Sequence, residues 1–481
     1  MRLCSLAVAG LLAGCAVGPN YAPPAAPPPA TGAFVDPGTA RVSTAPAQGE
    51  WWHLFSDPAL DRLVAEALSH NTDVRSAAAN LRRARAILSE ARTARLPSTD
   101  LSASAVRQRI GAASAGTTGI PNSDPNAPDA YTSDFFTVGF DASYEIDLFG
   151  RVSRSIEAAR ADSESARAAL DAARVAVAAE TARTYAQACG FAAQAEVARE
   201  TVRLQAKTVD ITRRLLDAGR GTQRDLDQAQ VLSENARAQA PTFEAERRAA
   251  LYALATLTGR PPAELDADAA KCLTPPSVAT LIPVGDGAAL LARRPDVRQA
   301  ERALAADTAR IGVATAALYP SIRLLGSISL GASDIDDLGK GSSLNYSAGP
   351  LISWSFPNIG VARARIRQAR AGADASLAAF DGAVLTALRE VEQALARYAG
   401  TLEANAALRR GEASASNAAR IAELRFNAGR DSFLQRLDAE RDRADARAAL
   451  ARSNAELAEA QVALFKALGG GWETAPEPER R

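Results

Sequence analysis

The sequence is poor in the side chains that enzymes commonly use in catalysis. Its 481 residues include two histidines, four cysteines, one methionine and about 5% aromatic residues. His53 and His70 are too far apart in context to suggest a site, and the cysteines do not follow metal-ligand spacing. Zinc sites and histidine-based acid–base chemistry are therefore nearly excluded, and we predict no catalytic residue and no metal.

The sequence also lacks a surplus of charge of either sign. Its 55 basic residues balance 55 acidic ones, so the formal net charge is zero. Arginine outnumbers lysine 51 to 4, but the acids are mixed evenly with it and no basic run is visible. This balance argues against nucleic acid as a partner.

Alanine supplies about half of the apolar residues that are present, which make up 47% of the chain. A core rich in alanine must come from close backbone approach along extended surfaces rather than from large side chains. The composition therefore favours long helices over a compact globule, although the length alone would suggest two to four ordinary domains.

The first residues read as a secretory signal that ends in a lipidation site. Arg2 precedes the apolar stretch Leu3 to Leu12, and Leu12-Ala13-Gly14-Cys15 matches a lipobox. We predict a signal peptide over residues 1–14 and a diacylglyceryl group on Cys15, the only non-protein group expected. The alternative is an ordinary signal with a chance cysteine. Ala16, in place of the aspartate that retains lipoproteins at the inner membrane, favours delivery to the outer membrane.

Residues 15–50 form a proline-rich leader, which we predict to be an extended tether. Cys189 and Cys272 are the only other cysteines of the mature chain, and they imply no disulfide framework. Whether these two pair with each other remains open.

The chain contains two copies of one unit. Asp73–Ala77 resembles Asp296–Ala300 at an offset of 223, and Ala218–Arg220 recurs as Ala428–Arg430 at an offset of 210. The change in offset falls in a variable loop, residues 110–134 in the first copy and 333–344 in the second. We assign repeat 1 to residues 51–286, repeat 2 to 287–469, and a tail to 470–481.

Each repeat predicts the same order of helices. Helical stretches at about 57–95 and 287–317 are followed, beyond the strands, by very long ones at about 151–217 and 361–427. Glycine turns at about 218–222 and 428–432 lead into last helices at about 222–258 and 432–468, and Pro241 should kink the first of these. Coiled-coil-like packing is indicated by apolar or small residues spaced by seven or fourteen: Ile156, Leu170, Val177, Thr184, Phe191 and Ala198.

Each repeat also predicts two strands, at about 97–109 and 135–148 and at about 320–331 and 346–356. Apolar residues alternate with polar ones, and the runs have the length that a tilted strand needs to cross a membrane. No mature segment reads as a membrane-spanning helix. Four strands cannot close a barrel, so several chains must share one; two would give eight strands and three would give twelve. Only twelve leave a lumen for bulky solutes.

These residues resemble the TolC family of outer-membrane efflux ducts, most closely its OprM-, CusC- and NodT-like lipoprotein branch. The opening from Cys15 to Tyr21, the segment Trp51–Leu60 and both glycine turns carry the resemblance, which covers nearly the whole mature chain. It implies a mainly α fold with a membrane β-barrel: a homotrimer with a shared 12-strand barrel, a 12-helix periplasmic tunnel and an equatorial region. The residues after the leader, the bridge from Gly259 to about Asp286 and the tail after Gly469 would form that equatorial region.

The resemblance implies passive export of small molecules delivered by an inner-membrane resistance-nodulation-division pump through a periplasmic adaptor. It places Leu434 and Asp438 at the apolar and acidic positions of a periplasmic aperture, with Gln435 where TolC has a second acidic ring. The alternative is that Asp438 pairs with Arg436 or Arg441 on a solvated helix. The helix tips that meet the adaptor would be formed by Gly219 and Thr222 in the first repeat and by Gly429 and Ser432 in the second. Thr222 and Ser432 would be the helix caps.

Two other functions remain open from the sequence. One is the exit duct of a type I secretion system, although the lipobox favours efflux. The other is a lipid-anchored periplasmic coiled-coil scaffold without a pore. Asp334, Asp336 and Asp337 resemble a calcium cluster, but they lack a fixed ligand spacing and more often form a solvated loop.

Overall fold

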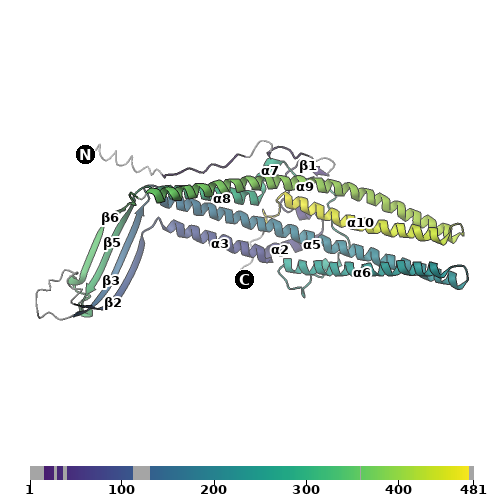
Figure 1. Cartoon of the computed structure of the whole chain (residues 1–481), viewed down its shortest axis with the longest axis horizontal. Coiled ribbons are helices and arrows are strands. Elements are labelled where there is room, and N and C mark those ends of the chain that lie inside the picture. The colour runs from purple at the N-terminus through teal and green to yellow at the C-terminus, as the bar shows by residue number, and fades with distance from the viewer. Residues whose placement is uncertain (1–15, 26–29, 36–40, 112–129, 358, 476–481) are drawn as a thin grey trace. The chain divides into compact units, whose positions relative to one another are not determined.

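The chain forms long helices and one four-stranded sheet in the computed structural model, which describes residues 16–25, 30–35, 41–111, 130–357 and 359–475 (Figure 1). These residues divide into two compact units. The strand unit contains the segment up to Pro23, Arg83–Ser163 and Ala303–Leu377; the hairpin unit contains Pro24–Arg82, Glu164–Arg302 and the chain from Ala378 onward. Each unit therefore draws on both sequence repeats.

Four helices dominate the chain and form two long hairpins. Helices α5 (Arg151–Asp217) and α6 (Gln223–Leu257) make the first, and α9 (Ile359–Asn427) and α10 (Phe433–Ala467) make the second (Figure 1). Their bounds lie within two residues of those predicted from the sequence. Helix α6 stays helical through Pro241.

The shorter helical stretches are each broken in two, contrary to the prediction. The first consists of α2 (Pro58–His70) and α3 (Thr72–Thr93), and the second of α7 (Gly287–Arg293) and α8 (Pro295–Ala316). Asn71 interrupts the first because its Oδ1 accepts a hydrogen bond from the backbone N–H of Asp73 at 2.8 Å and starts a new helix. Arg294 interrupts the second because the residue before a proline is extended.

The predicted heptad positions of α5 lie at helix contacts. Ile156, Leu170, Val177, Thr184 and Ala198 are buried, and Phe191 is half-buried. Close approach also occurs at Gly190, where an added Cβ would lie 2.7 Å from the Ala455 side chain. The alanine surplus thus serves close helix packing, as the composition indicated.

The sheet consists of β2 (Ser98–Gly111), β3 (Ala130–Ile146), β5 (Ser321–Ala332) and β6 (Leu344–Ser353), all antiparallel in the order β2-β3-β5-β6 (Figure 1). The first variable loop is shorter than predicted because Gly111 pairs with Ala130 and extends the β2–β3 hairpin. Strand β6 ends at Ser353, three residues before the predicted end. The second loop contains two short 3-10 turns, Ile335–Asp337 and Gly341–Ser343.

The sheet has the alternating faces that the sequence predicted. Leu101 pairs with Phe140, Phe140 with Ile328 and Ile328 with Tyr346, so one row of apolar side chains crosses all four strands. These four side chains are all exposed within the single chain, Tyr346 by 82%. So continuous an apolar surface requires lipid or protein to cover it.

Helix α9 contains a stretch that, by length and composition alone, passes as a membrane-spanning helix, which we did not identify from the sequence. Among the described residues, it alone contains an 18-residue window that is long and apolar enough by composition, and 22% of that window is buried. Charged residues within the window and beside it obscure this stretch in the sequence.

The described parts of the leader pack against the body, so they are not a free tether. In the strand unit, Arg154 donates from Nη2 to Oδ1 of Asn20 at 2.7 Å, and Val17 N donates to Phe149 O at 3.3 Å. A Cβ on Gly18 would lie only 2.5 Å from Cα of Gly312. In the hairpin unit, β1 (Val42–Ser43) pairs in parallel with β4 (Ile282–Pro283).

The largest apolar cluster lies in the hairpin unit and joins the three segments predicted to meet there. Trp51 of the 3-10 helix η2 (Trp51–Phe55) stacks on Phe465 with ring centroids 5.0 Å apart, and its Nε1 donates to Gly470 O of the tail at 3.3 Å. Ile282 of the bridge is fully buried in the same cluster. The residues after the leader, the bridge and the tail therefore share one core.

A disulfide between Cys189 and Cys272 fastens the bridge to α5. This answers the question that the sequence left open. The two cysteines are separated by 83 residues and their Cα atoms lie 5.1 Å apart.

Removal of this disulfide should lower the free energy of unfolding by about 2–4 kcal/mol, because the unfolded chain regains the freedom of a long loop. Thermal unfolding of the wild type and of the Cys189→Ala/Cys272→Ala variant would measure this. The wild type should lose stability when a reductant is added, and the double variant should not respond. Equal unfolding midpoints for the two oxidised proteins would contradict the prediction.

Candidate functional site

The first hairpin reverses at a glycine that takes a left-handed conformation. Gly219 has φ +64, and the backbone N–H groups of Gly219 and Arg220 donate to the carbonyls of Leu216 and Leu215 at 2.9 and 2.8 Å. This is a Schellman ending. Thr222 then caps α6: its hydroxyl accepts from Asp225 N, and Asp225 accepts from Thr222 N in return. Hydrogen bonds from Thr222 lower the pKa of Asp225.

The second hairpin repeats this geometry. Gly429 has φ +69, and Gly429 N and Arg430 N donate to Phe426 O and Arg425 O, each at 2.9 Å. Ser432 caps α10 through a capping box with Gln435. Both capping predictions, Thr222 and Ser432, are confirmed. Gln435 takes the position in this capping box that Asp225 takes in the first one.

The second tip is further braced by aromatic contacts. Phe426 and Phe433 make an edge-to-face contact across the turn at 6.1 Å, and the Arg436 guanidinium lies 5.2 Å from the Phe426 ring centre. Arg425 Nε also donates to Asp431 at 2.8 Å. The first tip has Leu216 and Gln223 in place of the two rings. The aromatic residues that flank the second turn are a sequence signal for this bracing, although we did not predict it.

Leu434 and Asp438 lie one helical turn apart near the start of α10, and both are exposed. Leu434 is 58% exposed. The expected partners of Asp438 are engaged elsewhere: Arg436 with Glu423 at 3.6 Å, and Arg441 with Asp445 at 3.9 Å. Among the described residues Asp438 makes no ion pair, so the pairing with Arg436 or Arg441 that the alternative invoked is not seen in the single chain.

Substitution of either cap should loosen its tip. Thr222→Ala and Ser432→Ala should each cost about 1 kcal/mol of local stability, because a helix N–H loses its acceptor. Hydrogen exchange of the first turns of α6 and α10 should become about fivefold faster in the respective variant. Thr242→Ala, an exposed site in the middle of α6, is the control. Unchanged exchange in both cap variants would contradict the role of the capping boxes.

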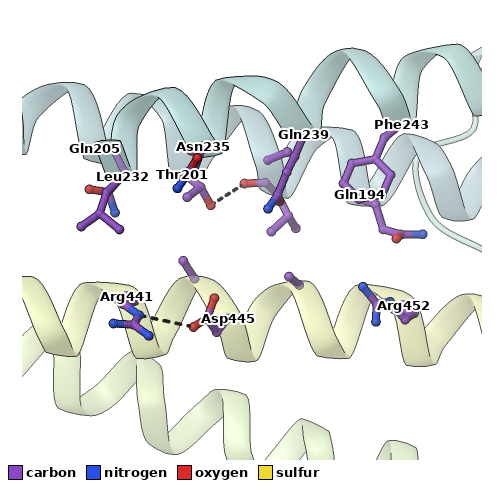
Figure 2. Close-up of a pocket in the computed structure, with 15 residues that line it drawn as sticks. Gln194, Thr201, Gln205, Leu232, Asn235, Gln239, Phe243, Arg441, Asp445 and Arg452 are labelled. Carbon is purple, nitrogen blue, oxygen red and sulfur yellow. Dashed lines mark hydrogen bonds and ion pairs between the residues drawn. The ribbon is translucent and has the colours of Figure 1, made fainter. Parts of the chain in front are cut away.

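A groove of about 190 Å³ separates α10 from α5 and α6 farther from the tips (Figure 2). Gln205 and Arg441 lie at one end of it and Gln194 and Arg452 at the other. Gln205 is 95% buried, and its Oε1 has no hydrogen-bond partner among the described residues. Alanine and amide side chains line much of the rest. This polar groove between the two hairpins was not predicted, because the residues that line it are far apart in sequence.

The acidic loop of β5–β6 is held by its own hydrogen bonds. Asp334 Oδ1 accepts from Asp336 N at 3.1 Å, and Asp337 pairs with Lys340. No grouping of three histidine, cysteine, aspartate or glutamate residues suited to a metal ion occurs in the part of the chain that the structure describes. Cys15, the predicted lipidation site, lies outside the described residues.

A sheet with one apolar exposed face, followed by paired helices reaching glycine-capped tips, defines an outer-membrane channel protein of the efflux type. The chain belongs to the outer membrane efflux protein family, whose model matches residues 63–260 and 288–470. It is a component of an efflux system and its location is the outer membrane.

Individual relatives agree along nearly the whole chain. Nodulation protein T of Rhizobium leguminosarum bv. trifolii is 32% identical over 467 residues, covering 96% of each chain. Toluene efflux pump outer membrane protein TtgI of Pseudomonas putida is also 32% identical, again covering 96% of each chain. The solved structure of the outer-membrane channel OprN matches with a TM-score of 0.85 at 35% identity, covering 95% of this chain and 100% of that one.

Proposed function

We propose that three copies of this chain join edge to edge into a closed 12-strand barrel that forms a passive duct through the outer membrane. The observation that carries the proposal is the sheet itself: four strands, with β2 and β6 pairing on one side only, and an exposed apolar face. An open edge is not viable in lipid, so the two edges must meet those of other copies. Three copies give a lumen wide enough for solutes.

In this proposal the duct exports small molecules delivered by an inner-membrane pump of the resistance-nodulation-division class through a periplasmic adaptor. The name of one relative, a toluene efflux pump protein, supports small organic solutes as cargo. The tips around Gly219, Thr222, Gly429 and Ser432 would contact the adaptor. The chain itself would catalyse no reaction and hold no cofactor other than a lipid on Cys15, which would anchor it in the membrane.

The same arrangement would close the duct at Leu434 and Asp438. Three copies around one axis would bring three leucines and three carboxylates to the narrowest point. The absence of an ion pair at Asp438, among the residues that the structure describes, supports this role. Unpaired carboxylates on the axis would repel anions and favour cations.

Cysteine crosslinking tests the number of copies. Ala103→Cys on β2 together with Ala348→Cys on β6 places one thiol on each edge. On oxidation in membranes we expect a ladder of one, two and three chains with nothing larger. A panel of neighbouring edge positions covers the register between copies.

An internal pair provides the matched control. Val138→Cys and Leu330→Cys are direct cross-strand partners within one chain and should bridge without raising the mass. Three results would overturn the trimer: crosslinked products no larger than two chains, products larger than three chains, or no crosslinked product between chains although the control pair forms its disulfide.

A further inference from the structure

The two helices that continue the edge strands carry exposed arginines for which the described part of the chain offers no ion pair. On α9, directly after β6, Arg363, Arg365, Arg367 and Arg370 are all exposed. None makes an ion pair with another described residue, and the whole segment 338–373 contains no acidic residue. Basic and acidic residues are evenly mixed in the chain as a whole, but this segment carries an excess of positive charge.

The other edge has the same character. On α3, which leads into β2, Arg83, Arg85 and Arg92 are exposed, and none has an ion pair among the described residues. Between residues 83 and 99 the only acid is Glu90. Basic side chains therefore accumulate beside both open edges of the sheet.

Most arginines beside the inner strands β3 and β5 form ion pairs within the chain. Arg151 binds Glu145 at 2.6 Å, Arg323 lies 3.5 Å from the same carboxylate, and Arg310 binds Asp162 at 2.6 Å. Arg154 is also paired, and Arg160 on α5 is the exposed exception. Apart from Arg160, these inner arginines have partners within the chain, whereas those beside the edges make no ion pair among the described residues.

Two exposed aromatic side chains near these arginines are of the kind found at a membrane boundary. Trp354 and Phe356, between β6 and α9, stack at 4.9 Å and are 52% and 61% exposed. Such aromatic side chains lie at the level of lipid headgroups. Arg363 and Arg367 are in the first turns of α9, and Arg92 is in the last turn of α3. All three are therefore close to headgroup depth.

We propose that Arg92, Arg363 and Arg367, here called the arginine seam, bind the phosphate groups of anionic phospholipids in the periplasmic leaflet of the outer membrane. The inference rests on the proposed trimer, in which β6 of one copy meets β2 of the next. The basic ends of α9 and α3 would then be neighbours and repel each other. Guanidinium groups bind phosphate through paired hydrogen bonds, so a lipid phosphate neutralises the junction.

Native mass spectrometry of the detergent-purified assembly tests this seam. The wild type, an Arg92→Gln/Arg363→Gln/Arg367→Gln variant and the control Arg160→Gln would be titrated with phosphatidylglycerol, phosphatidylethanolamine or inorganic phosphate. We expect the wild type and the control to bind phosphatidylglycerol preferentially. The triple variant should bind it more weakly by about fivefold for each arginine removed.

The other possible outcomes contradict either lipid binding by the arginine seam or the proposed duct itself. Equal phosphatidylglycerol affinity in the triple variant would place the lipid elsewhere. Displacement of phosphatidylglycerol by inorganic phosphate at equal concentration would show a free-anion site. If the wild type forms trimers and conducts ions but has no preference for the anionic lipid, the seam fails and the proposed duct stands. If it forms no trimer, the duct fails.

Discussion

Asp438→Ala is expected to make the duct leak and to reduce its preference for cations. In the proposed trimer the substitution removes three unpaired carboxylates from the narrowest point. Charge-lined passages concentrate ions of opposite sign by tenfold or more, so the cation-to-anion permeability ratio should fall by about tenfold. Single-channel recording would measure that ratio, and antibiotic uptake by cells would measure the leak.

The control must remove the same charge from the same helix face away from the constriction. Glu456 is exposed on α10 and lies five turns beyond Asp438 at the same angular position. Glu456→Ala should leave selectivity and leakage near the wild type. Leu434→Ala should raise conductance with less effect on selectivity, because it removes bulk rather than charge. Unchanged leakage and conductance in Asp438→Ala would contradict the assignment of the aperture.

Trp51→Ala is expected to be the most destabilising single substitution in the hairpin unit. Trp51 is 1% exposed, stacks on Phe465 and donates to Gly470 O, so its removal opens a large cavity where three segments meet. Loss of a buried tryptophan costs about 3–5 kcal/mol. Thermal unfolding and the amount of protein reaching the outer membrane would both measure the loss.

Tyr252→Ala offers a comparison on α6, where the side chain is 45% exposed. That substitution should change the free energy of unfolding by less than about 1 kcal/mol. If Trp51→Ala and Tyr252→Ala have equal effects, the cluster around Trp51 does not hold the segment after the leader, the bridge and the tail together.

The long elements were predictable because their signals are local. No proline interrupts α5 or α9. Gly150 stands before α5, Pro357 stands before α9, and Gly219 and Gly429 follow the two helices, so their bounds follow from the sequence. The broken helices also carried local signals that we underweighted: Asn71 before Thr72 and Asp73 is a capping pattern, and Pro295 forces its neighbour out of the helix. The start of β3 could not be placed, because small polar residues precede it and pairing with β2 extends it.

In the candidate site, too, the features with local sequence signals were predictable and those that depend on distant contacts were not. The caps Thr222 and Ser432 follow from residue type and spacing, and the structure confirms them. The pairing of Cys189 with Cys272 depends on how the bridge folds back onto α5, which no local pattern reveals. Likewise, the sequence could not show that Asp438 lacks an ion pair among the described residues, because Arg436 and Arg441 pair with Glu423 and Asp445 only in the folded chain. The proposed role of Asp438 in the aperture depends on contacts between copies, which the sequence of one chain does not reveal.

Single-channel conductance of the purified protein in planar bilayers tests the central claim most directly. The proposed duct predicts discrete, reproducible channel openings from protein that migrates as a detergent-resistant trimer, with cation preference lost in Asp438→Ala. Folded, membrane-inserted protein that forms neither a trimer nor a conducting channel would contradict the proposed duct and would favour a lipid-anchored coiled-coil scaffold without a pore.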